Sequence, residues 1–245
     1  MVNTKATSEV KILISKLIWV FIYILLLVSL CVSGIVLFQK TNYILTYVDG
    51  PSMYPTLNNY KNSLYHDCGL VDESETMKKY MERFDIVITY YQTDYTNGKL
   101  NRYADKKVKR LIGLPNEKVH IYTMDEVIDD KGTVGKVRHL EIAKRISEEE
   151  FGEYVDIPLP FDVYNISYLG SDVVHSDCEY ELGDDEYFVV GDNWKQSRDS
   201  SDPVIGAVTK EMITGVLIKT IGYCTVNSTT KEIEKIYETE EKYFK

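Results

Sequence analysis

Apolar residues form one long run near the start of the chain and only short segments after it. Residues 17–38 include no charged side chain. At about 1.5 Å per residue, a helix of this length covers roughly 33 Å, enough to cross a bilayer's hydrocarbon core of about 30 Å. The apolar region of a cleavable leader is shorter, roughly 7 to 15 residues. The pattern therefore predicts an uncleaved transmembrane α-helix over 17–38.

The charges beside this run predict its orientation. Lys5, Lys11 and Lys16 precede it, whereas Lys40 alone follows closely. Because basic residues are enriched on the cytoplasmic side of a membrane span, we expect residues 1–16 to form a cytoplasmic tail. Residues 39–245 are then an extracytoplasmic domain, and the chain is predicted to be a single-pass protein of the cell membrane.

After residue 40 the pattern is typical of β-strands. Four segments are short, rich in β-branched and aromatic residues and bounded by turn formers: 84–90, 119–122, 186–190 and 215–221. They predict a mainly β, antiparallel domain.

Two stretches are less regular. The first, 58–82, includes a short helix expected over about 73–83, and the second, 125–185, is acidic and Tyr-rich, with a helix start expected at Ser147-Glu148-Glu149-Glu150.

Charge and cysteine content exclude several classes of function. The first 40 residues hold four lysines and one glutamate, which leaves 24 of the 28 basic and 37 of the 38 acidic residues, and a formal charge of −13, on the rest. Such a domain does not suit nucleic acid, whose phosphates require a basic face. Three cysteines lie beyond the apolar run: Cys68, Cys178 and Cys224. Three cysteines allow at most one disulfide within the chain.

The histidines give no indication of a metal site. None has the spacing of zinc ligands, so we expect ordinary surface or loop positions for His66, His120, His139 and His175. We expect neither a metal nor a cofactor.

Two motifs carry candidate chemistry. Ser52 lies in the run Gly-Pro-Ser-Met-Tyr-Pro-Thr-Leu, and Lys109 opens the run Lys-Arg-Leu-Ile-Gly-Leu-Pro. A serine hydroxyl is a weak nucleophile at neutral pH and needs a base within hydrogen-bonding reach. A lysine serves as that base only when neutral, and burial among apolar groups such as Leu111 and Ile112 favours the neutral form.

The order of these motifs resembles that of type I signal peptidases. Four blocks carry the resemblance: 52–57, 84–87, 109–115, and Gly191-Asp192-Asn193 followed by Ser197 and Asp199-Ser200. The single apolar run and the residues before Ser52 are more similar to the Gram-positive form. The resemblance implies an antiparallel β catalytic core with a β-rich accessory lobe, at about 120–186 in a peptidase domain of 39–245. It also implies removal of signal peptides from exported preproteins at the lipid bilayer, with the secretion translocon as a further partner.

The resemblance assigns roles to individual residues. Ser52 is implied as the nucleophile and Lys109 as its base, with Ser197 orienting the lysine amine. Acidic positions that hold the site's loops together correspond to Asp192 and Asp199, and Arg110 is expected to pair with one of them. The backbone N–H of Ser52 is expected to bind the oxyanion together with a second donor from the region of Gly50 or a water.

Three positions depart from the family pattern. Trp194 and Ser201 stand where the family often has arginines, so a family salt bridge to Asp199 is either missing or remade by Arg198 or Arg110. Gly50 stands where some members have a hydroxyl that donates to the oxyanion.

Because of these departures, the alternative to an active signal peptidase is a catalytically weakened homologue that serves as an assembly or binding factor for surface proteins such as pilins. A self-cleaving serine-lysine protease is more remote, because those proteins have a DNA-binding segment and no anchor.

Overall fold

The structure is a computed structural model. It describes residues 2–60, 62, 64–127, 129–159, 166–167 and 177–244. The chain divides into two units, one that ends at Tyr43 and one that begins at Ile44. Each unit is described by itself.

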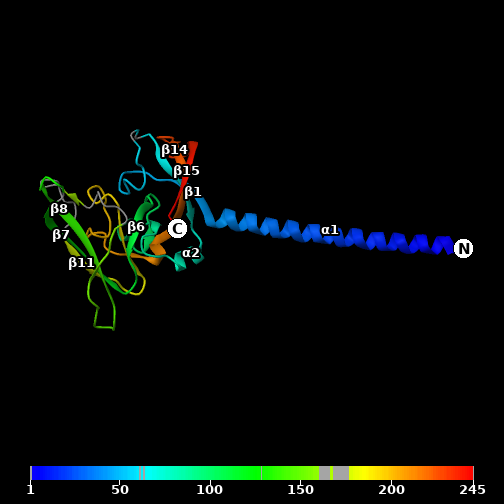
Figure 1. The fold of residues 1–245 in the computed structure, drawn as a ribbon, viewed down its shortest axis with the longest axis horizontal. Helices are drawn as coiled ribbons and strands as arrows, with labels where there is room; N and C mark the ends of the chain where they lie inside the picture. The colour runs from blue at the N-terminus through cyan, green and yellow to red at the C-terminus, as the bar shows by residue number, and fades with distance from the viewer. Residues whose placement is uncertain are drawn as a thin grey trace. The chain divides into compact units, whose positions relative to one another are not determined.

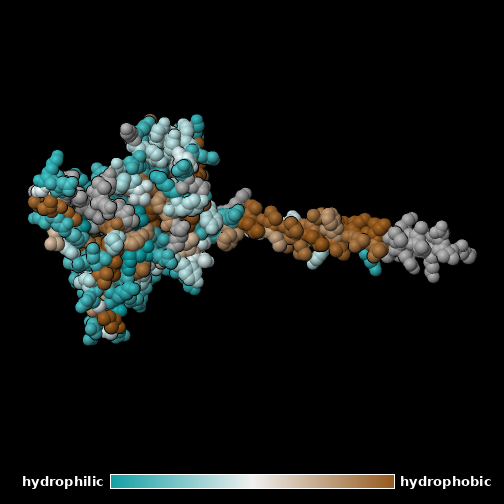
Figure 2. Space-filling model, viewed as in Figure 1, coloured by the Kyte–Doolittle hydropathy of each residue, from teal (hydrophilic) through white to brown (hydrophobic). Residues whose placement is uncertain are grey.

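The first unit is a single long helix, α1, Val2–Asn42 (Figure 1). Within it, Leu13–Gln39 is long and apolar enough to cross a membrane by length and composition. Its side chains are exposed along this length and appear as a continuous apolar surface in Figure 2. The predicted N-terminal apolar helix is confirmed, and the membrane crossing and its orientation remain predictions.

The second unit is mainly antiparallel β-structure, as predicted. Its larger sheet has the order β1-β2-β14-β3-β6-β12-β13, and β15 also pairs with β14. The strands of this sheet are β1 (Tyr43–Tyr47), β2 (His66–Asp72), β3 (Ile86–Thr89), β6 (Lys107–Gly113), β12 (Glu186–Val190), β13 (Val208–Thr209), β14 (Ile213–Val226) and β15 (Ile233–Tyr243). Three of the four predicted strand segments correspond to β3, β12 and β14, with β14 longer than expected because it pairs with three neighbours.

A second sheet has the order β10-β8-β7-β11, with β9 on the edge of β8. Its strands are β7 (Glu117–Val127), β8 (Val134–Lys144), β9 (Val155–Asp156), β10 (Ile166–Ser167) and β11 (Cys178–Glu181). The fourth predicted segment, 119–122, lies within β7. This sheet packs on the first through a shared core that includes Phe188 and Val190 of β12 and Ile121 and Leu140 of β7 and β8. The predicted lobe boundaries, about 120–186, remain a prediction.

The helix start predicted at Ser147 is wrong. Residues 147–150 form a turn in which the Ile146 N–H donates to the Glu150 carbonyl, and Arg145 pairs with Phe151 as a β-bridge. The strand that precedes this turn continues its pairing across it, so sheet contacts override a local preference for a helix N-terminus. The helix expected over about 73–83 exists as α2, Glu75–Lys79, which begins after the capping residue Ser74.

The remaining regular elements are short. They are the 3₁₀ turns η1 (Gln92–Asp94) and η3 (Lys210–Met212), and the two-stranded ribbon of β4 (Tyr95–Thr96) and β5 (Lys99–Leu100). The cysteines Cys68, Cys178 and Cys224 are free thiols. His66, His120 and His139 are half-buried residues of β2, β7 and β8 rather than loop residues, and His175 lies outside the described residues.

Candidate active site

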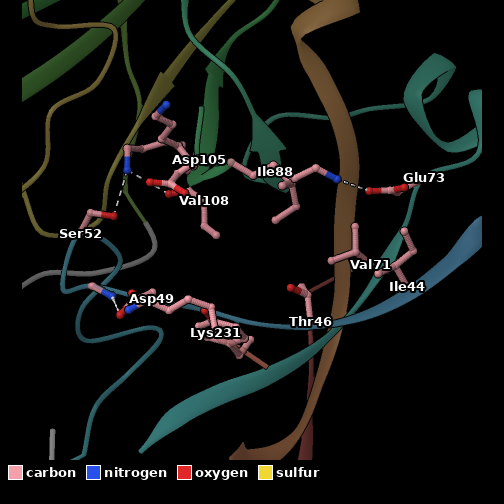
Figure 3. A pocket seen from close by; sticks show the side chains of 15 residues that line it. Ile44, Thr46, Asp49, Ser52, Val71, Glu73, Ile88, Asp105, Val108 and Lys231 are labelled. Atoms are coloured by element: carbon pink, nitrogen blue, oxygen red, sulfur yellow. Dashed lines mark hydrogen bonds and ion pairs between the residues drawn. The ribbon is translucent and has the colours of Figure 1, made fainter. Parts of the chain in front are cut away.

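The structure brings Ser52 and Lys109 together, although 57 positions separate them in the chain. Lys109 lies in the middle of β6, which pairs with β3 on one side and β12 on the other. Ser52 lies in the loop after β1. The distance from Lys109 Nζ to Ser52 Oγ is 2.9 Å, and Lys109 Nζ also donates to the Val108 carbonyl at 3.0 Å (Figure 3). A base is thus within reach of the serine hydroxyl.

Burial changes the protonation of Lys109. The residue is 4% exposed, and desolvation lowers the pKa of its ammonium to about 8. The negative charges of Asp199 and Asp192 oppose this shift, while the positive charge of Lys107 adds to it. A lysine with a pKa near 8 has about a tenth of its molecules neutral at pH 7, against fewer than one in a thousand for a lysine in water.

The loop that carries Ser52 is held from both ends. The Ser52 carbonyl accepts from the Asn193 backbone N–H at 2.9 Å, and the Asn193 side chain donates to the Pro51 carbonyl at 3.0 Å. On the other side, the Asn58 amide donates to the carbonyls of Val48 at 2.8 Å and Gly50 at 3.0 Å. Sequence reasoning missed Asn58, because its role depends on the backbone of a loop whose shape the sequence does not show.

Arg110 follows Lys109 on β6 and projects to the opposite side of the strand. Its guanidinium pairs with both carboxylate oxygens of Asp192, at 2.6 and 2.7 Å, and donates to the Phe84 carbonyl at 2.8 Å. Thr56 also donates to Asp192. Asp192 is fully buried, so this bidentate pair ties β6 to the loop after β12 and to the Ser52 loop.

Asp199 is a second buried carboxylate near the site, 2% exposed. It accepts from the hydroxyls of Ser197 at 2.6 Å and Ser201 at 2.7 Å, and from the backbone N–H groups of Gly191 and Ser201. Among the described residues no basic side chain lies within salt-bridge distance of it, since Arg110 pairs with Asp192 and Arg198 with Asp202. The orienting role expected of Ser197 remains a prediction.

Gly191 makes room for the meeting of these loops. A Cβ atom there would overlap the Ser197 side chain and the Ser52 carbonyl oxygen. Only glycine therefore allows the segment after β12 to lie against the loop that carries Ser52. The sequence shows a glycine directly before Asp192-Asn193. It does not show the contact with Ser197 and Ser52 that requires glycine at this position.

The Ser52–Lys109 pair lines a cleft of about 570 Å³ (Figure 3). Apolar lining comes from Ile44, Val71, Ile88 and Val108, and charged lining from Asp49, Glu73, Asp105, Lys106, Lys107 and Lys231. Lys106 pairs with Glu73 at 2.7 Å. The Gly50 N–H donates to the Asp49 side chain at 2.9 Å, whereas the hydrogen bonds described include none from the Ser52 N–H.

The sequence has relatives of known name. The family model described as "Signal peptidase, peptidase S26" matches residues 15–221. The chain belongs to this signal peptidase family. "Signal peptidase I S" of Bacillus subtilis (strain 168) is 32% identical over 173 residues, which cover 69% of this chain and 71% of that protein. "Signal peptidase I" of Rickettsia conorii (strain ATCC VR-613 / Malish 7) is 31% identical over 115 residues, which cover 41% of this chain and 40% of that protein.

The family match includes every residue of the candidate site described in this section except Lys231. The resemblance to signal peptidases drawn from the motifs is thereby confirmed at the level of the family. The end of β14 and all of β15 lie beyond the matched residues.

Proposed function

We propose that the protein is a membrane-anchored serine endopeptidase that removes N-terminal signal peptides from exported preproteins, with Ser52 as the nucleophile and Lys109 as the general base. The observation that carries this proposal is the 2.9 Å separation of Lys109 Nζ and Ser52 Oγ, with the lysine almost fully buried. Membership in the signal peptidase family supports the same reaction and substrate class.

Neutral Lys109 accepts the Ser52 hydroxyl proton as Ser52 Oγ attacks the carbonyl carbon of the scissile peptide bond. The oxyanion that forms is stabilised by the Ser52 backbone N–H, with a second donor from the Gly50 region or a water. The Lys109 ammonium then gives its proton to the leaving amine, so the C–N bond breaks and an acyl ester remains on Ser52. Lys109, neutral again, deprotonates a water that hydrolyses the ester and returns both groups to their starting state.

The other buried polar groups position this pair. Asp192 and Arg110 hold β6 against the loops, and Asp199 organises the segment that contains Ser197. The cleft binds the substrate as an extended chain, with small side chains at the first and third positions before the cut facing its apolar lining. The helix α1 holds the enzyme in the bilayer, beside membrane-bound preproteins that leave the translocon.

The direct test is to incubate the purified full-length protein in detergent with a preprotein and to sequence the new N-terminus. Ser52→Ala and Lys109→Ala should each abolish cleavage while the fold is retained. Lys109→Arg should also fail, because a guanidinium is not deprotonated near neutral pH. Cleavage at a near wild-type rate by either alanine variant would contradict the proposed pair, and absence of cleavage by the wild type would favour a binding factor for surface proteins.

A further inference from the structure

Arg138 is a buried charged residue on a strand face that it shares with residues of the apolar core. It lies on β8 and is 7% exposed. Residues two and four positions further along the same face, Leu140 and Ile142, are 1% and 3% exposed and belong to the core between the two sheets. A buried guanidinium is costly unless an opposite charge or strong acceptors face it.

The side chain of Arg138 packs against the segment after β12 that carries Trp194 and Asp199. Its guanidinium lies 5.0 Å from the centre of the Trp194 ring. Arg138, Trp194, Ser201 and Asp199 line one small cavity that has no room for a water molecule. Asp199 is a buried carboxylate with no salt bridge among the described residues, so a buried cation and a buried anion line the same cavity.

Asp199 in turn acts on the proposed Ser52–Lys109 pair, through hydrogen bonds and through its charge. It accepts a hydrogen bond from Ser197 and one from the Gly191 N–H, and Gly191 lies against the Ser52 carbonyl. Its negative charge favours the protonated form of Lys109. That form cannot accept the Ser52 proton, so an uncompensated Asp199 would oppose the proposed mechanism.

We infer that Arg138 is a positioning residue of this site, whose guanidinium balances the charge of Asp199 across the Trp194 cavity and so allows Lys109 to reach its neutral form. This inference rests on the proposed function. It also accounts for Trp194 and Ser201, which stand where the family often has arginines: a guanidinium reaches the same region from β8 instead.

Other charged and titratable groups lie near Lys109 and near the Arg138–Asp199 cavity. Near Lys109, Asp192 is paired with Arg110 and Lys107 with Asp94. The remaining groups are Asp49 and Asp105 on the cleft wall, Tyr91 and Cys178 near Asp199, and Asp177 near Arg138. Of the two buried carboxylates that act on Lys109, Asp192 has a salt bridge and Asp199 has none among the described residues, which singles out Asp199 as the charge that Arg138 balances.

The test is the pH dependence of kcat/KM for preprotein cleavage by the full-length protein in detergent. Arg138→Met and Arg138→Gln remove the charge, so the midpoint of the profile should move up by roughly 0.5 to 1 pH unit, with a loss of about 3- to 10-fold at pH 7 and little change at pH 10. Arg138→Lys keeps the charge and should keep the midpoint. The matched control is Arg145→Met, whose guanidinium also lies over a ring, that of Phe151, and which should leave the profile unchanged.

A second variant moves the charge rather than removing it. Ser201 lines the same cavity, so Arg138→Met combined with Ser201→Arg should return the midpoint toward that of the wild type. An equal loss of rate at every pH, with an unchanged midpoint, would show that Arg138 acts only in packing and would overturn the inference. If neither charge-removing variant folds, adding Asp199→Asn to Arg138→Met should restore folding, and no restoration would also overturn it. The proposed function fails separately, through cleavage by Ser52→Ala.

Discussion

Lys109 is the residue at which burial and electrostatics oppose each other most directly. Desolvation brings its pKa down to about 8, even though Asp199 and Asp192 favour the charged form. A depressed lysine pKa means that the neutral base is scarce below that pH and abundant above it. The rate of a lysine-based enzyme therefore rises with pH where a histidine-based one has already levelled off.

We predict that kcat/KM for preprotein cleavage rises about tenfold per pH unit below pH 7, passes its midpoint near pH 8 and persists to pH 10. The measurement is the cleavage rate from pH 5 to 10. His120→Ala and His139→Ala serve as controls, because both histidines pair with glutamates of the second sheet. Loss of activity in one of these variants, together with an active Lys109→Ala, would reject the lysine as base.

The sequence was sufficient to single out Ser52 and Lys109 as candidates, because both lie in motifs of characteristic composition, and the structure places their side chains 2.9 Å apart. It was not sufficient for Asn58 or Arg138. Asn58 acts through backbone carbonyls of its own loop, and Arg138 acts through a cavity lined by residues of both sheets and of the segment after β12. Neither role depends on neighbouring sequence, so only the three-dimensional arrangement reveals it.

At the scale of elements, the Arg110–Asp192 pair joins β6 to the loop after β12. We predict that Asp192→Asn destabilises the protein by roughly 3 to 5 kcal/mol, because it leaves Arg110 buried without its counter-charge. The measurement is the midpoint of thermal or denaturant unfolding. Arg198→Ala is the control, since its pair with Asp202 is solvent-exposed and should contribute less than about 1 kcal/mol. Equal effects of the two substitutions would contradict this account.

Gly191 sets how closely two loops approach. Gly191→Ala should reduce cleavage at least tenfold, because the added Cβ overlaps Ser197 and the Ser52 carbonyl and so displaces Ser52, the proposed nucleophile. Gly183→Ala offers a matched control in the turn before β12, where an added Cβ meets only the Glu186 side chain at ordinary contact distance. The readout is kcat/KM, with circular dichroism to check the fold. A Gly191→Ala enzyme of wild-type activity would show that the loops have room to move.

Strands were easier to predict than turns for a physical reason. The segments of β3 and β12 are apolar enough to be buried on both faces, so composition alone indicates them. The turn at 147–150 has residues typical of a helix N-terminus, but the strands on either side leave no length for a helix. Element boundaries thus depend on pairing partners that are distant in the sequence, as in β14, which pairs with β2, β3 and β15.

At the scale of the whole molecule, the lysines on either side of the apolar helix predict the topology. Protease added outside spheroplasts should digest the domain after residue 40, whereas a tag placed before Lys11 should be protected. Western blotting of both ends before and after lysis measures this. Digestion of the tag in intact spheroplasts would reverse the orientation.

The proposed membrane anchoring also has a kinetic consequence. Enzyme and preprotein that share one membrane meet in two dimensions, so the effective concentration of substrate is higher than in solution. Deleting residues 1–39 should therefore give a soluble enzyme with unchanged cleavage of a short soluble peptide but markedly slower cleavage of a preprotein in vesicles. The full-length protein reconstituted in the same vesicles is the control. Equal loss on both substrates would mean that the helix supports the fold of the catalytic unit rather than its encounter with the substrate.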